Sequence, residues 1–456
     1  MVMEPKLYEA AMEGDIAGLQ ECMNPEDVQL TANNNTVLHV AVQFDKGSTR
    51  VKEILAKMGS SLLCMVNSDG DTPLHIAAGE GRRDAVKDLI DCAKKECNEL
   101  ESGVKVITKM LRKTNKDGDT ALHMSIRSVS KNRHVVVKML TEEDPESSNS
   151  ANNAEETPLY LAVERQSHFM RKVHCDIVSE IVTTCTLSDY GGPEGRTALH
   201  AAVFAQCSYC PKNLCKWKPE LTKKADINGW TPLHYAAGIG YTWLFKELFN
   251  LDKSVACLRT TDEDGSNTAL HIATRQGHKH IMKEILSSNP DCWEMANGRG
   301  QNILHIAIEY EQRKIVKFIL GKPWRTNLIN KKDHDGNTPI HLFATSNNSR
   351  LLDLTTLKDI VDLMAINKEN MTPLDLVTQS DQYERLLVRA ALSARISTSR
   401  SKRRRPLHSN LHATGIDHNF YRLGVLRNQV ADPKFFLQGT HKTHGFHHSA
   451  AGKCWF

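Results

Sequence analysis

The sequence has 456 residues, of which 40% are hydrophobic and 25% are charged. This composition excludes a chain that is disordered throughout. The length exceeds that of one ordinary globular domain, so the chain must form several domains or a repeat array. The net charge of +4 is uneven, because the last 72 residues hold 13 Lys and Arg against two acidic residues, which puts +11 on that tail and −7 on the rest.

The first predicted element is a helix at residues 7–15, and a four-residue phrase of the Thr-Pro-Leu-His kind then recurs ten times. The copies begin at Thr36, Thr72, Thr120, Thr157, Thr197, Thr231, Thr268, Asn302, Thr338 and Thr372. Their spacings of 34 to 48 residues lie just above the ankyrin period of about 33 residues. The sequence therefore resembles an ankyrin-repeat array, and residues 7–15 resemble the first helix of an additional N-terminal unit.

Each part of the phrase has a mechanical role. Thr is a good N-cap, because its hydroxyl can satisfy an N–H group at the start of a helix, and Pro suits the first helical position. The Leu and the Ala pairs that follow give a small apolar face, and the His can bridge backbone groups between units. The phrase thus predicts where the first helix of each unit begins.

Two further elements complete a unit. A turn-rich segment precedes each phrase, as at residues 67–71, 115–119 and 333–337, where Asp or Asn near Gly favours the tight turn of an ankyrin finger. A second amphipathic helix follows each phrase, as at residues 281–286, 315–320 and 360–364, where apolar residues recur at helical spacing. No single unit can bury its apolar face, so neighbouring units must stack.

The predicted fold class is all-α: an ankyrin-repeat solenoid of about ten to eleven helix-turn-helix units with β-turn fingers, followed by a basic, disordered C-terminal tail. The predicted array covers residues 1–390, and the basic, His-containing tail covers residues 391–456. Irregular inserts interrupt the period near residues 92–109, 142–153 and 186–195. Inserts of this kind map to loops on one face of a repeat protein.

Several features together are similar to plant ankyrin proteins of the accelerated-cell-death type. They are the opening at residues 7–15, about ten units, the early inserts, and units such as Asn-Gly-Trp-Thr-Pro-Leu-His-Tyr-Ala-Ala at residues 228–237. The resemblance covers roughly residues 1–390 and implies a role in defence, cell death or stress signalling. Members of that family typically continue into a Pro-Gly-Gly region and membrane helices, which this sequence lacks; a soluble isoform or an incomplete gene model would each explain the difference.

The recurring histidines are His39, His75, His123, His200, His234, His271, His305 and His341. Stacked units place them about 10 Å apart, too far to share one metal ion, so we expect a structural role. Cys207 and Cys210, with Cys215 and His200 nearby, have half of a zinc-ligand spacing, but core cysteines are favoured because a second pair is absent. His441, His444, His447 and His448 could chelate a metal weakly, and no function is assigned to them.

No phosphate-binding loop, nucleophile elbow or kinase signature is found, so the sequence predicts neither an enzyme, a cofactor nor a metal site. We expect instead a protein-interaction scaffold or adaptor in intracellular signalling, whose concave ankyrin face binds other proteins. The predicted partner-binding residues stand just before the caps, and Trp230 is favoured as an aromatic anchor. They are Asp71, Asp119, Arg196, Trp230, Asn267, Gln301 and Asn337.

Two alternative functions stay open: a truncated form of a multi-pass membrane signalling protein, and a substrate adaptor for an enzyme such as a ubiquitin ligase. No nucleic-acid partner is expected. The run Lys402, Arg403, Arg404 and Arg405 is compatible with nuclear import or with an anionic surface, through an import receptor or a peripheral membrane contact.

The expected compartment follows from the cysteines and the N-terminus. Twelve Cys are irregularly spread, and the opening residues hold no apolar run of the signal-peptide kind, which indicates reduced thiols in an intracellular, cytoplasmic protein. No stretch approaches the ~20 apolar residues of a membrane-spanning helix. A nuclear location, or plasma-membrane association as in the plant family, is the alternative.

Overall fold

The computed structural model of the protein describes residues 2–22, 29–45, 50–96, 106–146, 150–165, 171–185, 188–261, 265–346, 348, 351–352, 357 and 360–378. The predictions for the tail 391–456, including Lys402, Arg403, Arg404 and Arg405, lie outside the described residues. The chain divides into two compact units, Met1–Phe318 and Ile319–Phe456, which are treated separately below.

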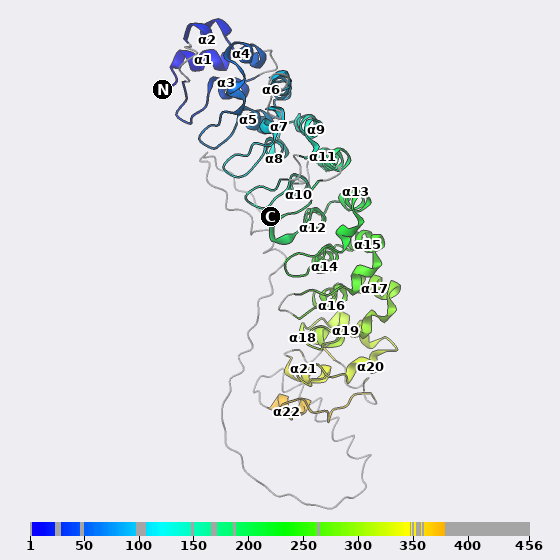
Figure 1. Ribbon diagram of the computed structural model, residues 1–456. Coiled ribbons are helices and arrows are strands. Elements are labelled where there is room, and N and C mark those ends of the chain that lie inside the picture. The colour runs from blue at the N-terminus through cyan, green and yellow to red at the C-terminus, as the bar shows by residue number, and fades with distance from the viewer. Residues whose placement is uncertain are drawn as a thin grey trace, which may run out of the picture. The chain divides into compact units, whose positions relative to one another are not determined.

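In the first unit, short helices alternate between an inner and an outer layer, and each helix contacts the next one of its own layer (Figure 1). The inner helices are α1 (Pro5–Glu13), α3 (Val37–Gln43), α5 (Pro73–Glu80), α8 (Ala121–Arg127), α10 (Pro158–Glu164), α12 (Ala198–Phe204), α14 (Pro232–Ile239), α16 (Ala269–Arg275) and α18 (Ile303–Glu309). The outer helices are α2 (Ile16–Cys22), α4 (Arg50–Met58), α6 (Arg83–Glu96), α9 (Arg133–Glu143), α11 (Arg171–Thr184), α13 (Cys210–Trp217), α15 (Thr242–Leu251) and α17 (Lys279–Ser288). This arrangement confirms the predicted all-α solenoid of helix-turn-helix units.

Shorter elements connect the layers. Among the described residues, helix α7 (Val106–Leu111) and several 3₁₀ helices lie mostly between an outer helix and the next finger. The 3₁₀ helices are η1 (Ser60–Cys64), η3 (Pro193–Gly195), η4 (Pro219–Thr222), η5 (Lys253–Cys257) and η6 (Pro290–Glu294). Helix α19 (Arg313–Leu320) contains the division between the two compact units.

The recurring phrase starts each inner helix from α3 onward, as predicted. Thr72 has extended backbone angles, and its side-chain oxygen accepts a hydrogen bond from the His75 N–H at 3.4 Å. The His75 ring closes the cap, because its Nδ1 accepts the Thr72 N–H at 3.2 Å. Since Nδ1 is an acceptor, the ring proton resides on Nε2. The same reciprocal cap stands at the start of α3, α8, α12, α14, α16 and α18.

The Nε2 nitrogen of six cap histidines reaches the following unit. The Nε2 atoms lie 2.9–3.1 Å from backbone carbonyl oxygens in the next unit. The pairs are His39 with Asp71, His75 with Asp119, His123 with Glu156, His200 with Trp230, His234 with Leu258 and His271 with Met295. The predicted structural role of these histidines is confirmed.

Many of the fingers are built around one Asn or Asp side chain, whereas a threonine hydroxyl, of Thr31 or Thr260, takes that place in two others. The Oδ1 of Asn115 accepts the N–H groups of Asp117 at 3.0 Å and Asp119 at 2.9 Å, which closes the turn. Gly118 occupies the tip with a φ of 75°, a backbone angle that glycine adopts without strain. Asn67, Asn152, Asp226 and Asn297 close their fingers in the same way.

All three predicted inserts can be followed in part. Helix α6 runs on to Glu96, which accounts for the start of the insert near residues 92–109, whereas residues 97–105 lie outside the described chain. After α9 ends at Glu143, residues 144–146 and 150–153 connect it to the next finger. The insert near 186–195 includes η3, and its residues 186–187 are outside the described chain.

The second compact unit, residues 319–456, contains α20 (Arg325–Ile329), α21 (Pro339–Thr345) and α22 (Pro373–Thr378) among its described residues. The helix predicted at residues 360–364 is wrong, because these residues form turns. Side chains near and far in the sequence take the backbone donors of this segment: the Asp362 N–H binds the Asn330 Oδ1 at 2.9 Å, and the Met364 N–H binds the Asp362 Oδ1 at 3.0 Å. Side chains thus take the N–H groups that a helix would use.

Candidate protein-interaction face

The inner helices and the fingers of the first compact unit share one line of side chains, called here the inner strip. It consists of the residue just before each cap and the residue seven positions after that cap, which lies two helical turns on and faces the same side. The pairs are Asp119 with Arg127, Glu156 with Glu164, Arg196 with Phe204, Trp230 with Gly238, Asn267 with Arg275, and Gln301 with Glu309.

In three of these pairs the finger side chain contacts the helix side chain directly. Asp119 and Arg127 form an ion pair. The Gln301 amide nitrogen donates to the Glu309 carboxylate at 2.8 Å. The Arg196 guanidinium lies over the Phe204 ring at 5.4 Å from its centroid. The chemistry of the strip therefore differs from unit to unit, while the spacing of the two positions in the sequence is the same.

Most of the predicted partner-binding residues are less accessible than a binding finger requires. Asp119, Arg196, Asn267 and Gln301 are only 2%, 9%, 7% and 7% exposed, whereas Asp71 and Trp230 are half-buried. Asn337, in the second compact unit, is also half-buried. Their role in partner binding stays a prediction.

The buried positions are used for contacts between units. The Nδ2 of Asn115 donates to the Asp71 carboxylate at 2.9 Å, and the Nδ2 of Asn152 donates to the Asp119 carboxylate at 2.8 Å. The Asn297 Nδ2 reaches the Asn267 Oδ1 at 3.3 Å. A side-chain ladder thus joins the finger of one unit to the residue before the cap of the preceding unit. Sequence reasoning missed this ladder, although its signal, an Asn five positions before a cap, is visible in the sequence.

The N-terminal part of the strip is charged and mostly self-neutralised. Arg127 also binds Glu156 in the next unit at 2.7 Å. Burial raises the pKa of the Glu164 carboxyl, with a further contribution from the negative charge of Glu156. Burial lowers the pKa of Arg165, and the neighbouring Arg127 adds to this effect. Acidic and basic side chains here offset one another, so this part presents little net charge.

The aromatic part of the strip lies around Trp230. The Trp230 ring is 5.0 Å from the Tyr235 ring, which is 4.8 Å from the Phe204 ring. The Tyr235 hydroxyl donates to the buried Asp226 carboxylate at 2.6 Å, and burial together with this bond raises its pKa. Ile227, on the same finger as Trp230, is 68% exposed. This region, called here the Trp230 patch, offers apolar surface on a rigidly held base.

A neighbouring contact adds a positive charge and a further aromatic ring beside the patch. The Arg275 guanidinium lies over the Tyr310 ring at 4.6 Å from its centroid, and Tyr310 is exposed. Phe204, Arg275 and Tyr310 were not among the predicted site residues. Their signal was available, because each stands seven or eight positions after a cap.

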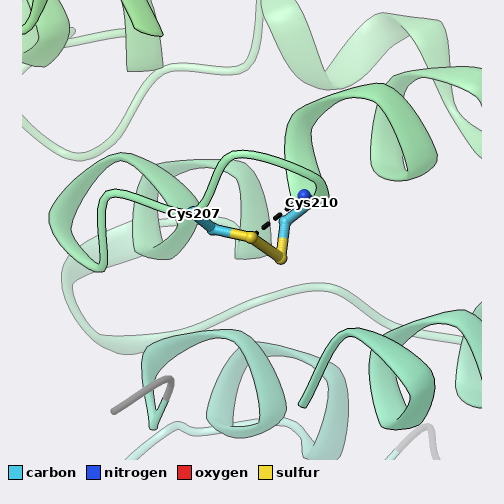
Figure 2. Close-up of a disulfide and its surroundings, with 2 residues drawn as sticks. All are labelled: Cys207 and Cys210. Carbon is cyan, nitrogen blue, oxygen red and sulfur yellow. Dashed lines mark hydrogen bonds between the residues drawn. A yellow bond between two sulfur atoms is a disulfide. The ribbon is translucent and has the colours of Figure 1, made fainter. Parts of the chain in front are cut away.

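The sequence pattern that suggested half a zinc site has a different structure. Figure 2 shows Cys207 and Cys210 joined by a disulfide, with the Cys210 N–H donating to the Cys207 Sγ at 3.0 Å. The expectation that the thiols are all reduced is therefore wrong for this pair. Both ring nitrogens of His200 are used, by Thr197 and by the Trp230 carbonyl. Cys215 is buried, which raises its pKa to about 12.

Neither a metal site nor a membrane-spanning helix is found among the described residues. Among them, no group of three or more His, Cys, Asp or Glu side chains is arranged to hold a metal ion. Within the same residues, every helix is too short or too polar to cross a membrane.

Comparison with known proteins identifies the repeat. A family model described as ankyrin repeats (3 copies) matches residues 7–101 and 240–328. The chain therefore carries ankyrin repeats, a fold that typically serves protein interaction rather than catalysis.

Several known proteins are similar to part of this chain. The chain is 31% identical over 158 residues to the human transient receptor potential cation channel subfamily A member 1, which is 34% of this chain and 13% of the channel. It is 26% identical over 311 residues to the poly [ADP-ribose] polymerase tankyrase of Caenorhabditis elegans, 65% of this chain and 13% of tankyrase. It is 23% identical over 267 residues to human B-cell lymphoma 3 protein, 59% of this chain and 53% of that protein. The chain thus spans only part of each relative, and the first two matches cover a small fraction of a much longer protein.

Proposed function

We propose that this protein is a protein-interaction scaffold in intracellular signalling and that it binds its partner through the inner strip, with the Trp230 patch as the main anchor. One observation carries the proposal. Most of the strip is used for pairs within the molecule, whereas the Trp230 ring is half-buried and its neighbour Ile227 is 68% exposed. Aromatic side chains that are held rigidly and partly exposed often dominate the free energy of protein association.

The mechanism is recognition by several units at once. The ladder and the histidine bonds hold successive units in a fixed register, so the strip is organised before a partner arrives. Such preorganisation lowers the entropy lost on binding. The charged pairs N-terminal to the patch then contribute specificity more than affinity, because they are already neutralised within the molecule.

The pathway is a finer part of the same proposal. The resemblance to plant proteins of the accelerated-cell-death type favours defence, cell-death or stress signalling. The ankyrin fold supports a non-catalytic role. The similarity to tankyrase does not oppose it, because the match covers only 13% of that enzyme. The basic residues Lys402, Arg403, Arg404 and Arg405 are proposed as an accessory contact for an import receptor or an anionic surface.

The experiment is affinity capture with the full-length protein and matched variants, read by quantitative mass spectrometry. Trp230→Ala removes the proposed anchor. Trp243→Ala is the control, because Trp243 is 46% exposed on the outer helix α15. A third variant replaces Lys402, Arg403, Arg404 and Arg405 by Ala.

We expect Trp230→Ala to reduce recovery of the captured partner by about tenfold or more, since an anchor residue contributes about 2 kcal/mol or more to association. Trp243→Ala and the tail variant should recover the partner as well as the unmodified protein does. Equal recovery with Trp230→Ala and the unmodified protein would refute the anchor. Loss of all partners with the tail variant would place recognition in the tail and refute the inner-strip mechanism.

A further inference from the structure

Two cysteines of successive units lie in contact on the described surface. The Sγ atoms of Cys257 and Cys292 are 3.3 Å apart. Cys257 is the last residue of η5, and Cys292 lies in η6, the equivalent connector one unit later. Cys257 is exposed, whereas Cys292 is 3% exposed. One thiol of the pair is therefore open to solvent and the other faces the interior.

The repeat architecture explains how this pair arises. Helices α15 and α17 pack side by side, so the connectors that follow them are also neighbours. The same two positions recur in other units with different residues. Cys64 ends η1 as Cys257 ends η5, and Met110 stands ten positions before its cap, as does Cys292. Cys64 therefore provides a natural comparison, because a thioether replaces the second thiol there.

We propose that Cys257 and Cys292 form a modification site: a reversible disulfide that covalently joins two successive units and that is made by exchange with a low-molecular-weight disulfide of the glutathione type. The two sulfur atoms need to approach by little more than 1 Å to reach the bonding distance of about 2.05 Å. This movement is small for side chains in two short connectors.

The exchange proceeds in two balanced steps. The Cys257 thiolate attacks one sulfur of the small disulfide, that S–S bond breaks, and one small thiolate leaves and takes up a proton from solvent. Cys292 then attacks the Cys257 sulfur, the mixed disulfide breaks, and the proton of Cys292 ends on the second departing small thiolate. The two protein thiols lose two electrons in total, and the small disulfide is reduced to two thiols.

The difference in burial indicates which of the two cysteines reacts first with the small disulfide. Burial raises the pKa of the Cys292 thiol to about 12, with an added contribution from its hydrogen bond with Cys257. Cys292 is therefore almost entirely protonated near neutral pH. Reaction with a solvent-borne reagent requires an accessible sulfur, which Cys257 has. Cys257 is thus the attacking residue and Cys292 the resolving one.

The proposed bond differs in its consequence from the disulfide between Cys207 and Cys210. That pair lies three residues apart within one unit, whereas Cys257 and Cys292 are 35 residues apart and belong to two units. Closing the longer loop removes more conformational freedom from the unfolded chain. Oxidation at this site is therefore expected to strengthen one boundary of the stack.

The test uses the full-length protein, reduced and then incubated with glutathione disulfide over a range of ratios to reduced glutathione. Free thiols are blocked by alkylation, and linked peptides are measured by mass spectrometry. The variant is Cys257→Ser, which alters an exposed side chain and should leave folding intact, as circular dichroism would verify. Cys64→Ser is the matched control at the equivalent position of another unit.

We expect the peptide pair linked through Cys257 and Cys292 in the unmodified protein and in Cys64→Ser, and its loss in Cys257→Ser. The thermal midpoint of the unmodified protein should be higher when oxidised than when reduced, and this difference should shrink in Cys257→Ser. The proposal is overturned if Cys257 stops at the mixed disulfide with glutathione at every ratio. It is equally overturned if Cys257 is linked to other cysteines as often as to Cys292.

Discussion

The cap histidines are neutral residues held in the interior by bonds at both ring nitrogens. Burial lowers the pKa of His75, His123, His200, His234 and His271 to about 4, from an ordinary value of 6.5. Bonds from the rings to backbone carbonyls act in the opposite direction but do not offset burial. A proton on Nδ1 would break the bond from the backbone N–H of the cap residue.

This arrangement predicts a specific loss of stability in acid. Between pH 6.5 and 4 the unfolded chain binds protons at these histidines while the folded chain does not, so the free energy of unfolding falls as the pH falls through this window. Above pH 6.5 both states are neutral at these rings and the contribution is complete. Each histidine changes the free energy of unfolding by up to about 1.4 kcal/mol per pH unit within the window.

The measurement is the thermal midpoint as a function of pH from 8 to 4. We expect a plateau above pH 6.5 and a steep decline below it. A midpoint that stays level down to pH 4.5, where most carboxyl groups are still ionised, would contradict the assignment of neutral histidines.

The ladder asparagines make a second prediction for single residues. Asn115 accepts two backbone N–H groups and donates to the Asp71 carboxylate, so Asn115→Ala removes three bonds and should cost about 1–3 kcal/mol of stability. Asn115→Asp keeps the two accepted bonds but places a second carboxylate beside Asp71. We expect it to be less destabilising than Asn115→Ala at pH 4 and to become more destabilising as the pH rises to 7.

Urea unfolding at the two pH values would measure these differences. If Asn115→Asp matched the unmodified protein at pH 7, the bond to Asp71 would have no energetic role.

At the scale of elements, fingers are joined by their backbones as well as by side chains. The N–H of Asn153 donates to the Asp117 carbonyl at 2.9 Å, and the N–H of Lys116 donates to the Asp69 carbonyl at 3.0 Å. One such bond links each finger to its neighbour at these steps. The fingers thus form a row of turns with a fixed spacing, which accounts for the close approach at Gly118.

Gly118→Ala should test that close approach. A Cβ at this position would lie 2.8 Å from the Asn153 backbone nitrogen, in addition to the strain of a φ of 75°. Gly195→Ala is the control, because its φ is 69° but its nearest neighbours would be 3.4 Å away. The free energy of unfolding of the control should fall by about 1–2 kcal/mol from backbone strain alone. That of Gly118→Ala should fall by more.

Chemical denaturation of both variants provides the comparison. Equal losses would show that the neighbouring finger moves aside without cost and that the finger contacts are loose.

The elements that could be predicted from the sequence are those fixed by local chemistry. Thr caps, the Asx-closed turns and the apolar spacing of α17 need only a few neighbouring residues, and the structure has them where the sequence predicted them. The prediction of a helix at residues 360–364 failed, because a short apolar pattern cannot reveal that Asn330 takes one of their N–H groups. The burial of Asp119 was hidden for a similar reason, since it depends on Asn152 in the next unit.

At the scale of the first compact unit, stability is a sum over units and the contacts between neighbours. Leu199, in the inner helix α12, is fully buried, and Leu199→Ala should cost about 2–5 kcal/mol. Because units contact only their neighbours, we expect the loss of protection from hydrogen exchange to be confined to α10, α12, α14 and their partner helices. Equal loss of protection from α1 to α18 would show that this unit unfolds as one cooperative block.

The bonds of the cap histidines also give the stack a polarity. Each of the described Nε2 bonds runs from one unit to a carbonyl in the unit that follows it, as from His200 to Trp230. Trimming whole repeats from the N-terminal side of the stack would leave the remaining rings with their acceptors. Trimming from the opposite side would strip the acceptor from the histidine of the new last repeat, so shortened versions of this protein are not equivalent at their two ends.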